Sequence, residues 1–205
     1  SLPSNLLVFF FLLFMTDVAG LSPSLAGFIV LVGKIWDAIN DPIVGWLSDR
    51  TRSPWGRRYP WIIYGAIPLG LSCLGLWIIP PLIPKEWLWV YYMAIALCFY
   101  GAFTVVLLPY GALSAELTSN YHERTRLISV RSFFSIAGSI ATLAIAQGIF
   151  SVIENPRQQY LILGVIGSTI AVIASFVCFW GTFPHYKQLG LHERVSVSDA
   201  SPNLW

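Results

Sequence analysis

Two aspartates, Asp37 and Asp41, lie inside a stretch that otherwise has the composition of a membrane-spanning helix. A carboxylate at the centre of a bilayer costs at least ~2.5–3.5 kcal/mol on insertion scales, so it is seldom retained for packing alone. The i, i+4 spacing places both side chains on one helix face, with Cβ atoms about 5–6 Å apart. Two negative charges held this close outside bulk water favour a cation. We therefore predict a cation or metal site at this pair, with Na⁺ or H⁺ as the ion.

Lys34 adds a positive charge to the same helix face, because Lys34, Asp37 and Asp41 follow the spacing i, i+3, i+7. One positive and two negative charges leave a net charge of −1, which a monovalent cation or a proton would neutralise. Binding of the ion would then change the free energy of moving this helix face into an environment without water. Such a change is the physical basis for coupling an ion to a conformational change. The alternative interpretation is a structural Lys34–Asp37 ion pair, with Asp41 bridged by water or a partner helix.

Further oxygen ligands are available near the two carboxylates. Asn40 contributes a side-chain carbonyl, and Pro42 lacks an N–H, so the backbone carbonyl four residues earlier loses its helical partner. Freed carbonyls of this kind coordinate Na⁺ in membrane carriers. Pro109 frees another carbonyl close to the hydroxyl of Thr104. If the two helices touch, we expect Thr104 to complete a cage of oxygen atoms.

The composition indicates the elements that must position this site. The chain has 205 residues, of which 56% are hydrophobic and 11% are charged, whereas soluble domains carry about 25% charged residues. We predict an all-α integral membrane protein with a six-helix bundle over residues 1–183. The six apolar stretches, each near the ~20 residues that span a bilayer, are 1–20, 24–48, 60–80, 87–113, 129–150 and 159–183. The first lacks a basic leader or an initiator Met, so we expect its first turns to be missing and the chain to be a fragment.

Charge placement predicts the orientation in the membrane. Nine of the 12 Lys and Arg residues fall in the 49–59 loop, the 114–131 segment and the C-terminal tail, where Lys187 and Arg194 lie. The positive-inside rule places these segments in the cytoplasm. We therefore expect a multi-pass protein of the plasma (inner) membrane, with residues 184–205 as a cytoplasmic segment.

The loop after the second apolar stretch combines one acidic and several basic residues. Asp49 lies at a predicted helix C-terminus, where the macrodipole disfavours negative charge, so it needs a partner such as Arg50, Arg57 or Arg58. We predict that this charge cluster closes a cytoplasmic gate during transport. A plain topogenic basic loop is the alternative.

Other classes of function find no support in the sequence. Catalytic triads, metalloprotease motifs and glycine-rich phosphate loops are absent from it. We therefore expect no enzyme activity, no cofactor beyond a coupling cation, and no nucleic-acid partner. The expected partners are a small solute and membrane lipid.

Three sequence elements resemble one transporter family: 16–22 (TDVAGLS), 36–42 (WDAINDP) and 52–57 (RSPWGR). Their order and residues are similar to the glycoside–pentoside–hexuronide:cation symporters, the melibiose-permease-like branch of the major facilitator superfamily. The resemblance implies that the chain is the N-terminal half of a twelve-helix carrier, with its six helices forming a 3+3 inverted repeat and a second six-helix half missing.

The resemblance also implies roles for individual residues. The helix 2 residues that bind the coupling cation in the family match Asp37, Asn40 and Asp41, and a helix 4 threonine matches Thr104. Arg131 resembles an arginine that lines the sugar site, and we expect Lys34 to contribute to the same site. At the places of a sugar-binding aspartate and tryptophan, however, this chain has Leu107 and Gly111.

The leading hypothesis is cation-coupled symport of a sugar or related small solute by alternating access. A carrier for an amphipathic, lysolipid-like solute is the second hypothesis, which Leu107 favours. A non-transporting six-helix membrane subunit is the third.

Overall fold

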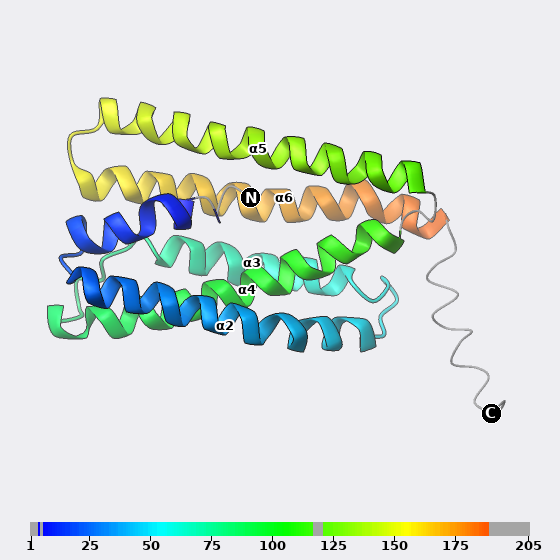
Figure 1. Cartoon of the computed structure of the whole chain (residues 1–205), viewed down its shortest axis with the longest axis horizontal. Helices are drawn as coiled ribbons and strands as arrows, with labels where there is room; N and C mark the ends of the chain where they lie inside the picture. The colour runs from blue at the N-terminus through cyan, green and yellow to red at the C-terminus, as the bar shows by residue number, and fades with distance from the viewer. Residues whose placement is uncertain (1–3, 5, 117–120, 189–205) are drawn as a thin grey trace.

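The computed structural model describes residues 4, 6–116 and 121–188, and every regular element in these ranges is helical. Helices α2 to α6 run roughly along the long axis of the molecule (Figure 1). The N-terminal stretch contains two short π-helical segments, η1 and η2, and a short 3₁₀ turn, η3, precedes α4. The bounds are η1 Leu7–Phe11, η2 Phe14–Val18, α2 Pro23–Arg50, α3 Tyr59–Gly75, η3 Lys85–Trp87, α4 Leu88–Glu116, α5 Tyr121–Val152 and α6 Pro156–Gln188.

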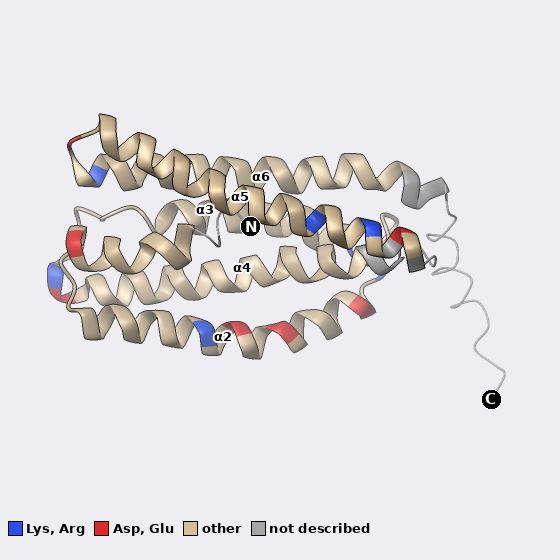
Figure 2. Ribbon diagram, turned by 45° about the horizontal axis from the view of Figure 1, so that its top comes forward, with Lys and Arg blue, Asp and Glu red and all other residues tan. Residues whose placement is uncertain are grey.

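Three helices within the described residues are long and apolar enough to cross a membrane: Lys85–Leu113, Thr125–Val152 and Pro156–Pro184. Shorter apolar helices cover Leu7–Val18 and Tyr59–Gly75. Helix α2 has 28 residues, which is long enough for a bilayer, but charged side chains interrupt its apolar middle (Figure 2). The prediction of an all-helical fold is thus confirmed over the described residues, while the six membrane spans and the inverted repeat stay predictions.

The helix ends differ from the predicted spans at three places. Helix α3 stops at Gly75 rather than near residue 80, and the consecutive prolines Pro80 and Pro81 disfavour helical backbone at the end of the predicted span. Helix α5 begins at Tyr121, well before the apolar stretch at 129, so its first two turns are polar. Helix α6 continues to Gln188; the rest of the predicted tail, residues 189–205 with Arg194, lies outside the described residues.

Close helix packing in the bundle depends on glycine. Helix α3 packs against both α4 and α6, and α2 packs against α4. A Cβ atom on Gly65 of α3 would lie 2.7 Å from the Val105 side chain of α4, and one on Gly70 would overlap Val172 of α6. Glycine at such positions lets two helix backbones approach in a membrane, where dispersion forces replace the hydrophobic effect.

An aromatic cluster joins the N-terminal helical stretch to α4, to α6 and to the turn after α3. Trp77 is only 2% exposed and stacks on Tyr160, with ring centroids 5.8 Å apart and planes 4° apart. Phe11, Phe14 and Tyr92 are also buried, and edge or tilted ring contacts connect them to each other and to Trp77. This arrangement fixes the ends of four elements relative to one another.

The face of α2 that packs on α4 positions the charged residues. Its fully buried members are Ala26, Ile29, Gly33, Val44 and Ser48. Within each group, 26–33 and 44–48, these residues are three or four apart, so they lie on one face of the helix. Between positions 33 and 44 this face has no buried residue. Positions 37 and 40 fill that gap, so the polar residues occupy the middle of an otherwise apolar helix interface.

Candidate cation-binding site

The hydroxyl of Thr104 in α4 lies against both acidic side chains of α2. Its Oγ1 is 3.0 Å from Asp37 Oδ1 and 3.1 Å from Asp41 Oδ1. Thr104 is 2% exposed, and the Asp37 side chain is 25% exposed, whereas Asp41 is exposed in the chain alone. The structure therefore brings together three of the four residues that the sequence predicts as cation ligands.

A single hydroxyl cannot satisfy two carboxylates at once. Thr104 Oγ1 carries one hydrogen, which it donates to one acceptor at a time. The second oxygen, at a similar distance, therefore lacks a hydrogen from this donor. A proton on one carboxyl group or a small cation among the three oxygens would remove that deficit. The geometry thus fits the hard oxygen chemistry of Na⁺ and also the sharing of a proton.

Asn40, the fourth predicted ligand, faces the same segment of α4. Its Nδ2 donates to the backbone carbonyl of Gly101 at 3.4 Å, which leaves the side-chain oxygen available as a ligand. A Cβ atom on Gly101 would lie 3.5 Å from Trp36 Nε1. That is an ordinary contact distance, so Gly101, which was not predicted from the sequence, contributes its backbone carbonyl to the α2–α4 contact rather than a close approach that only glycine allows.

Lys34 lies between the site and a second residue that the sequence analysis missed, Tyr100. Lys34 Nζ is 3.6 Å from Asp37 Oδ2 and 4.9 Å from the centroid of the Tyr100 ring. Tyr100 is 3% exposed, and its hydroxyl has no hydrogen-bond partner among the described residues. The signal that could have identified it is its position four residues before Thr104, on the same face of α4. The structure therefore places Lys34 beside the Asp37 carboxylate, and solute binding by Lys34 stays a prediction.

We predict that Thr104→Val lowers the apparent cation affinity of transport by about 10- to 100-fold, because it removes an oxygen ligand while keeping the side-chain volume. Thr104→Ser keeps the hydroxyl and is expected to retain most of the affinity. The measurement is the cation concentration that gives half-maximal stimulation of uptake.

Thr142→Val is the matched control for this prediction. Thr142 is 1% exposed, but its hydroxyl donates to the Gly138 carbonyl of its own helix, α5, at 2.7 Å. An equal loss of cation affinity in both variants would mean that Thr104 acts through packing alone.

Arg131 of α5 reaches toward α4 at a different level. Its guanidinium lies 5.1 Å from the centroid of the Tyr110 ring, and a Cβ atom on Gly111 would lie 3.6 Å from its Nη1. Gly111 is seven residues after Thr104, which places both on one face of α4, about 10 Å apart along the helix axis. The predicted solute residue Arg131 is therefore separate from the carboxylates but on their side of α4.

The four predicted gate residues do not form one cluster of contacts: Asp49 pairs with one arginine, and the other two arginines lie elsewhere. Arg58 Nη2 pairs with Asp49 Oδ1 at 3.0 Å and joins the end of α2 to the start of α3. Arg50 lies over the Trp46 ring, 3.9 Å from its centroid, and Arg57 is exposed. Asp49 thus has the partner that its position at a helix C-terminus requires.

We predict that Asp49→Arg slows initial uptake, and that Arg58→Asp in the same protein restores the rate by re-forming the pair in reverse. The Asp49 side chain is 60% exposed, so the loss of the pair should change stability by less than about 1 kcal/mol. Initial uptake rates and thermal melting of the single and double variants test this. A double variant as slow as Asp49→Arg would contradict a role for the pair itself.

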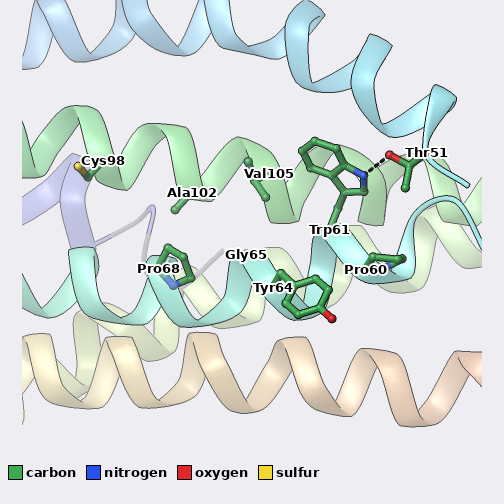
Figure 3. Close-up of a pocket in the computed structure, with 9 residues that line it drawn as sticks. All are labelled: Thr51, Pro60, Trp61, Tyr64, Gly65, Pro68, Cys98, Ala102 and Val105. Carbon is green, nitrogen blue, oxygen red and sulfur yellow. Dashed lines mark hydrogen bonds between the residues drawn. The ribbon is translucent and has the colours of Figure 1, made fainter. Parts of the chain in front are cut away.

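Two hollows in the structure are not lined by Asp37 or Asp41. A groove of about 600 Å³ lies between α3 and α4. In this groove Trp61 Nε1 donates to Thr51 Oγ1 at 2.8 Å, and the other lining residues are mainly apolar (Figure 3). A second hollow of about 720 Å³ lies among α3, α4, α5 and α6 and includes Leu107 and Tyr110 in its lining. Among the described residues, no acidic side chain lines either hollow.

Residues 2–199 match the family described as MFS/sugar transport protein. An uncharacterized symporter of Synechocystis is 49% identical over the full length of this chain, which covers 37% of that protein. A putative glycoside/cation symporter of Escherichia coli is 34% identical over 84% of this chain and 38% of its own length.

A third relative is the sodium-dependent lysophosphatidylcholine symporter 1-A of Danio rerio, 34% identical over 74% of this chain and 28% of its own length. The chain therefore spans well under half the length of these relatives. All three are symporters by name, and the family is one of transport proteins rather than enzymes. The chain belongs to the MFS/sugar transport protein family, in the glycoside–pentoside–hexuronide:cation symporter branch of the major facilitator superfamily.

Proposed function

We propose that this chain is the N-terminal six-helix half of a cation-coupled symporter that moves a sugar or related small solute by alternating access. The observation that carries this proposal is the approach of the Thr104 hydroxyl to two carboxylates, at 3.0 Å from Asp37 and 3.1 Å from Asp41. These oxygens come from two helices, so ion binding stabilises one arrangement of α2 and α4 over others. An ion with different affinities for two arrangements shifts the equilibrium between them.

The proposed architecture has six spans in two inverted groups of three, facing a second six-helix half. Exposed apolar side chains on α2 and α5 support a further interface with lipid or protein; examples are Phe28 (50% exposed), Trp46 (57%), Phe133 (68%) and Ile140 (64%). In carriers of this architecture the solute site lies near the middle of the bilayer, between the halves. The proposed location is the plasma (inner) membrane with the basic loops in the cytoplasm.

The proposed coupling ion is Na⁺ or H⁺. The names of two relatives, a glycoside/cation symporter and a sodium-dependent symporter, support a monovalent cation. Two carboxylates and one lysine within this site sum to a charge of −1. One sodium ion or one proton would neutralise that charge.

The proposed solute-binding residues are Arg131 and Lys34. Lys34 also lies beside the Asp37 carboxylate of the proposed cation site. Arg131 lies on the same side of α4 as the carboxylates, and Gly111 beside it leaves room that a side chain would fill. A guanidinium and an aromatic ring, here Tyr110, are suited to a polar solute with hydroxyl or carboxylate groups.

A lysolipid-like solute is the second candidate, because the 720 Å³ hollow has a mainly apolar lining. Tyr110 contributes to this lining and also lies under the Arg131 guanidinium. An acyl chain in the hollow with its phosphate at Arg131 would use both features.

The decisive experiment is counterflow in proteoliposomes, using the protein expressed from its complete open reading frame. A panel of labelled sugars, glycosides, hexuronides and a lysophospholipid is tested with and without Na⁺ at fixed pH, and with a pH gradient. Cation-stimulated counterflow of one sugar class supports the main proposal, and stimulation by the lysophospholipid alone supports the second. Full insertion without cation-stimulated counterflow of any solute would support a non-transporting membrane subunit instead.

A further inference from the structure

We infer that Lys34 determines the valence selectivity of the proposed cation site: its positive charge excludes divalent cations and leaves the site to monovalent ones. This inference rests on the proposed function and goes beyond it, because it assigns to Lys34 a role that is neither ion ligation nor solute binding. It makes Lys34 a positioning residue that acts through the carboxylates.

The first step is that Lys34 and Thr104 share one carboxylate. Asp37 uses Oδ1 for the Thr104 hydroxyl at 3.0 Å and presents Oδ2 to Lys34 Nζ at 3.6 Å. The ammonium group therefore contacts a different oxygen of the Asp37 carboxylate from the one that faces the Thr104 hydroxyl. From there it reduces the negative potential at the site without occupying the place of an ion.

The second step is that α4 supplies a surface that keeps the ammonium group in place. The Tyr100 ring lies 4.9 Å from Lys34 Nζ at its centroid, within the range of a cation–π contact. Tyr100 is 3% exposed, and its ring packs so closely on Gly33 that any side chain there would overlap it. The Lys34 side chain is itself 56% exposed, so this contact and the ion pair hold a group that is otherwise free to move.

The third step is charge balance. Carboxylate, hydroxyl and amide oxygens are suitable ligands for Na⁺ and equally for Ca²⁺ or Mg²⁺. Ligand type therefore cannot distinguish these ions, but net charge can. With Lys34 the local charge is −1, which one monovalent ion neutralises, whereas without Lys34 it is −2, which one divalent ion neutralises.

The test is direct binding of ⁴⁵Ca²⁺ and ²²Na⁺ to the purified full-length protein in detergent. We expect Lys34→Met to bind ⁴⁵Ca²⁺ at least about tenfold more tightly than the unmodified protein, with an affinity near the ~10⁻³ M range of weak oxygen sites. Mg²⁺ should displace ²²Na⁺ from this variant and not from the unmodified protein. Lys34→Gln is a second neutral variant in case the methionine lowers the yield, and Lys34→Arg should behave like the unmodified protein.

Two further variants separate charge from structure. Lys34→Met combined with Asp37→Asn restores a net charge of −1 while keeping an oxygen at position 37, so it should lose the ⁴⁵Ca²⁺ binding again. Lys85→Met removes an exposed lysine of η3, near the start of α4, and should change nothing.

Unchanged ⁴⁵Ca²⁺ binding in folded Lys34→Met and Lys34→Gln would overturn the inference. So would equal ⁴⁵Ca²⁺ binding in Lys34→Met with and without Asp37→Asn. The proposed function fails on a different result, the absence of both ²²Na⁺ binding and proton-coupled uptake in the unmodified protein.

Discussion

Asp41→Asn is expected to abolish cation-stimulated uptake, lowering it by at least about 100-fold while the protein still inserts and folds. The substitution keeps the size of the side chain and removes one of two negative charges at the site. A full charge at about 4 Å from an ion contributes about 4 kcal/mol at an effective dielectric constant of 20. Asp41 is exposed in the chain alone, so we expect a smaller but still dominant effect. Asp37→Asn should give the same phenotype.

The measurement is initial uptake into vesicles as a function of cation concentration, with the amount of inserted protein determined in parallel. Glu154→Gln is the matched control, because Glu154 is an exposed carboxylate in the short connection between α5 and α6. Unchanged uptake and unchanged cation stimulation in both aspartate variants would remove the basis of the proposed mechanism.

Gly164→Ala is expected to produce the largest loss of stability among single-methyl changes. A Cβ atom at Gly164 of α6 would lie 2.7 Å from Cγ and 2.9 Å from Cβ of Trp77. These atoms are next to the backbone, and Trp77 is held by its stack on Tyr160, so the tryptophan cannot rotate away. Inserting a methyl group into such a contact typically costs 1–3 kcal/mol, so we expect about that loss here. Thermal melting in detergent, with retention of the folded state after size-exclusion chromatography, measures it.

Gly181→Ala provides the control in the same helix, because a Cβ atom there would meet no atom of the described residues within 4 Å. Alanine favours helix over glycine by about 1 kcal/mol, so this variant should be as stable as the unmodified protein or more stable. If Gly164→Ala melts at the same temperature as Gly181→Ala, the close approach of α6 to Trp77 is not important for stability.

The chemistry of α2 could be predicted from the sequence because it is local. The spacing of Lys34, Asp37 and Asp41 places them on one helix face by geometry alone. Thr104 was predicted because it lies near the carbonyl that Pro109 frees and because it matches a helix 4 threonine of a known family, and the structure places its hydroxyl beside both carboxylates. Ion binding by these residues remains a prediction.

The parts that the sequence could not supply depend on contacts between distant residues. The Gly33–Tyr100 contact joins positions 67 residues apart, and neither residue type identifies the other as its partner. Arg58 was one of three candidate partners for Asp49, and only the geometry of the loop selects it. The polar start of α5 was not predicted because the span was drawn from apolar residues alone, and these begin only at residue 129.

Among the described residues, the polar contacts between α2 and α4 lie within about two turns of α2 and about one turn of α4, at residues 34–41 and 100–104. Elsewhere this interface is formed mainly by glycine and apolar side chains, including Gly45 against Leu108. Apolar surfaces define the register between two helices only weakly, since sliding exchanges one set of similar contacts for another. Loss of the ion would therefore leave each helix intact while allowing α2 to shift along α4. Distance distributions between spin labels on these two helices should accordingly broaden when the proposed coupling cation, Na⁺ or H⁺, is withdrawn, with no change in helical content.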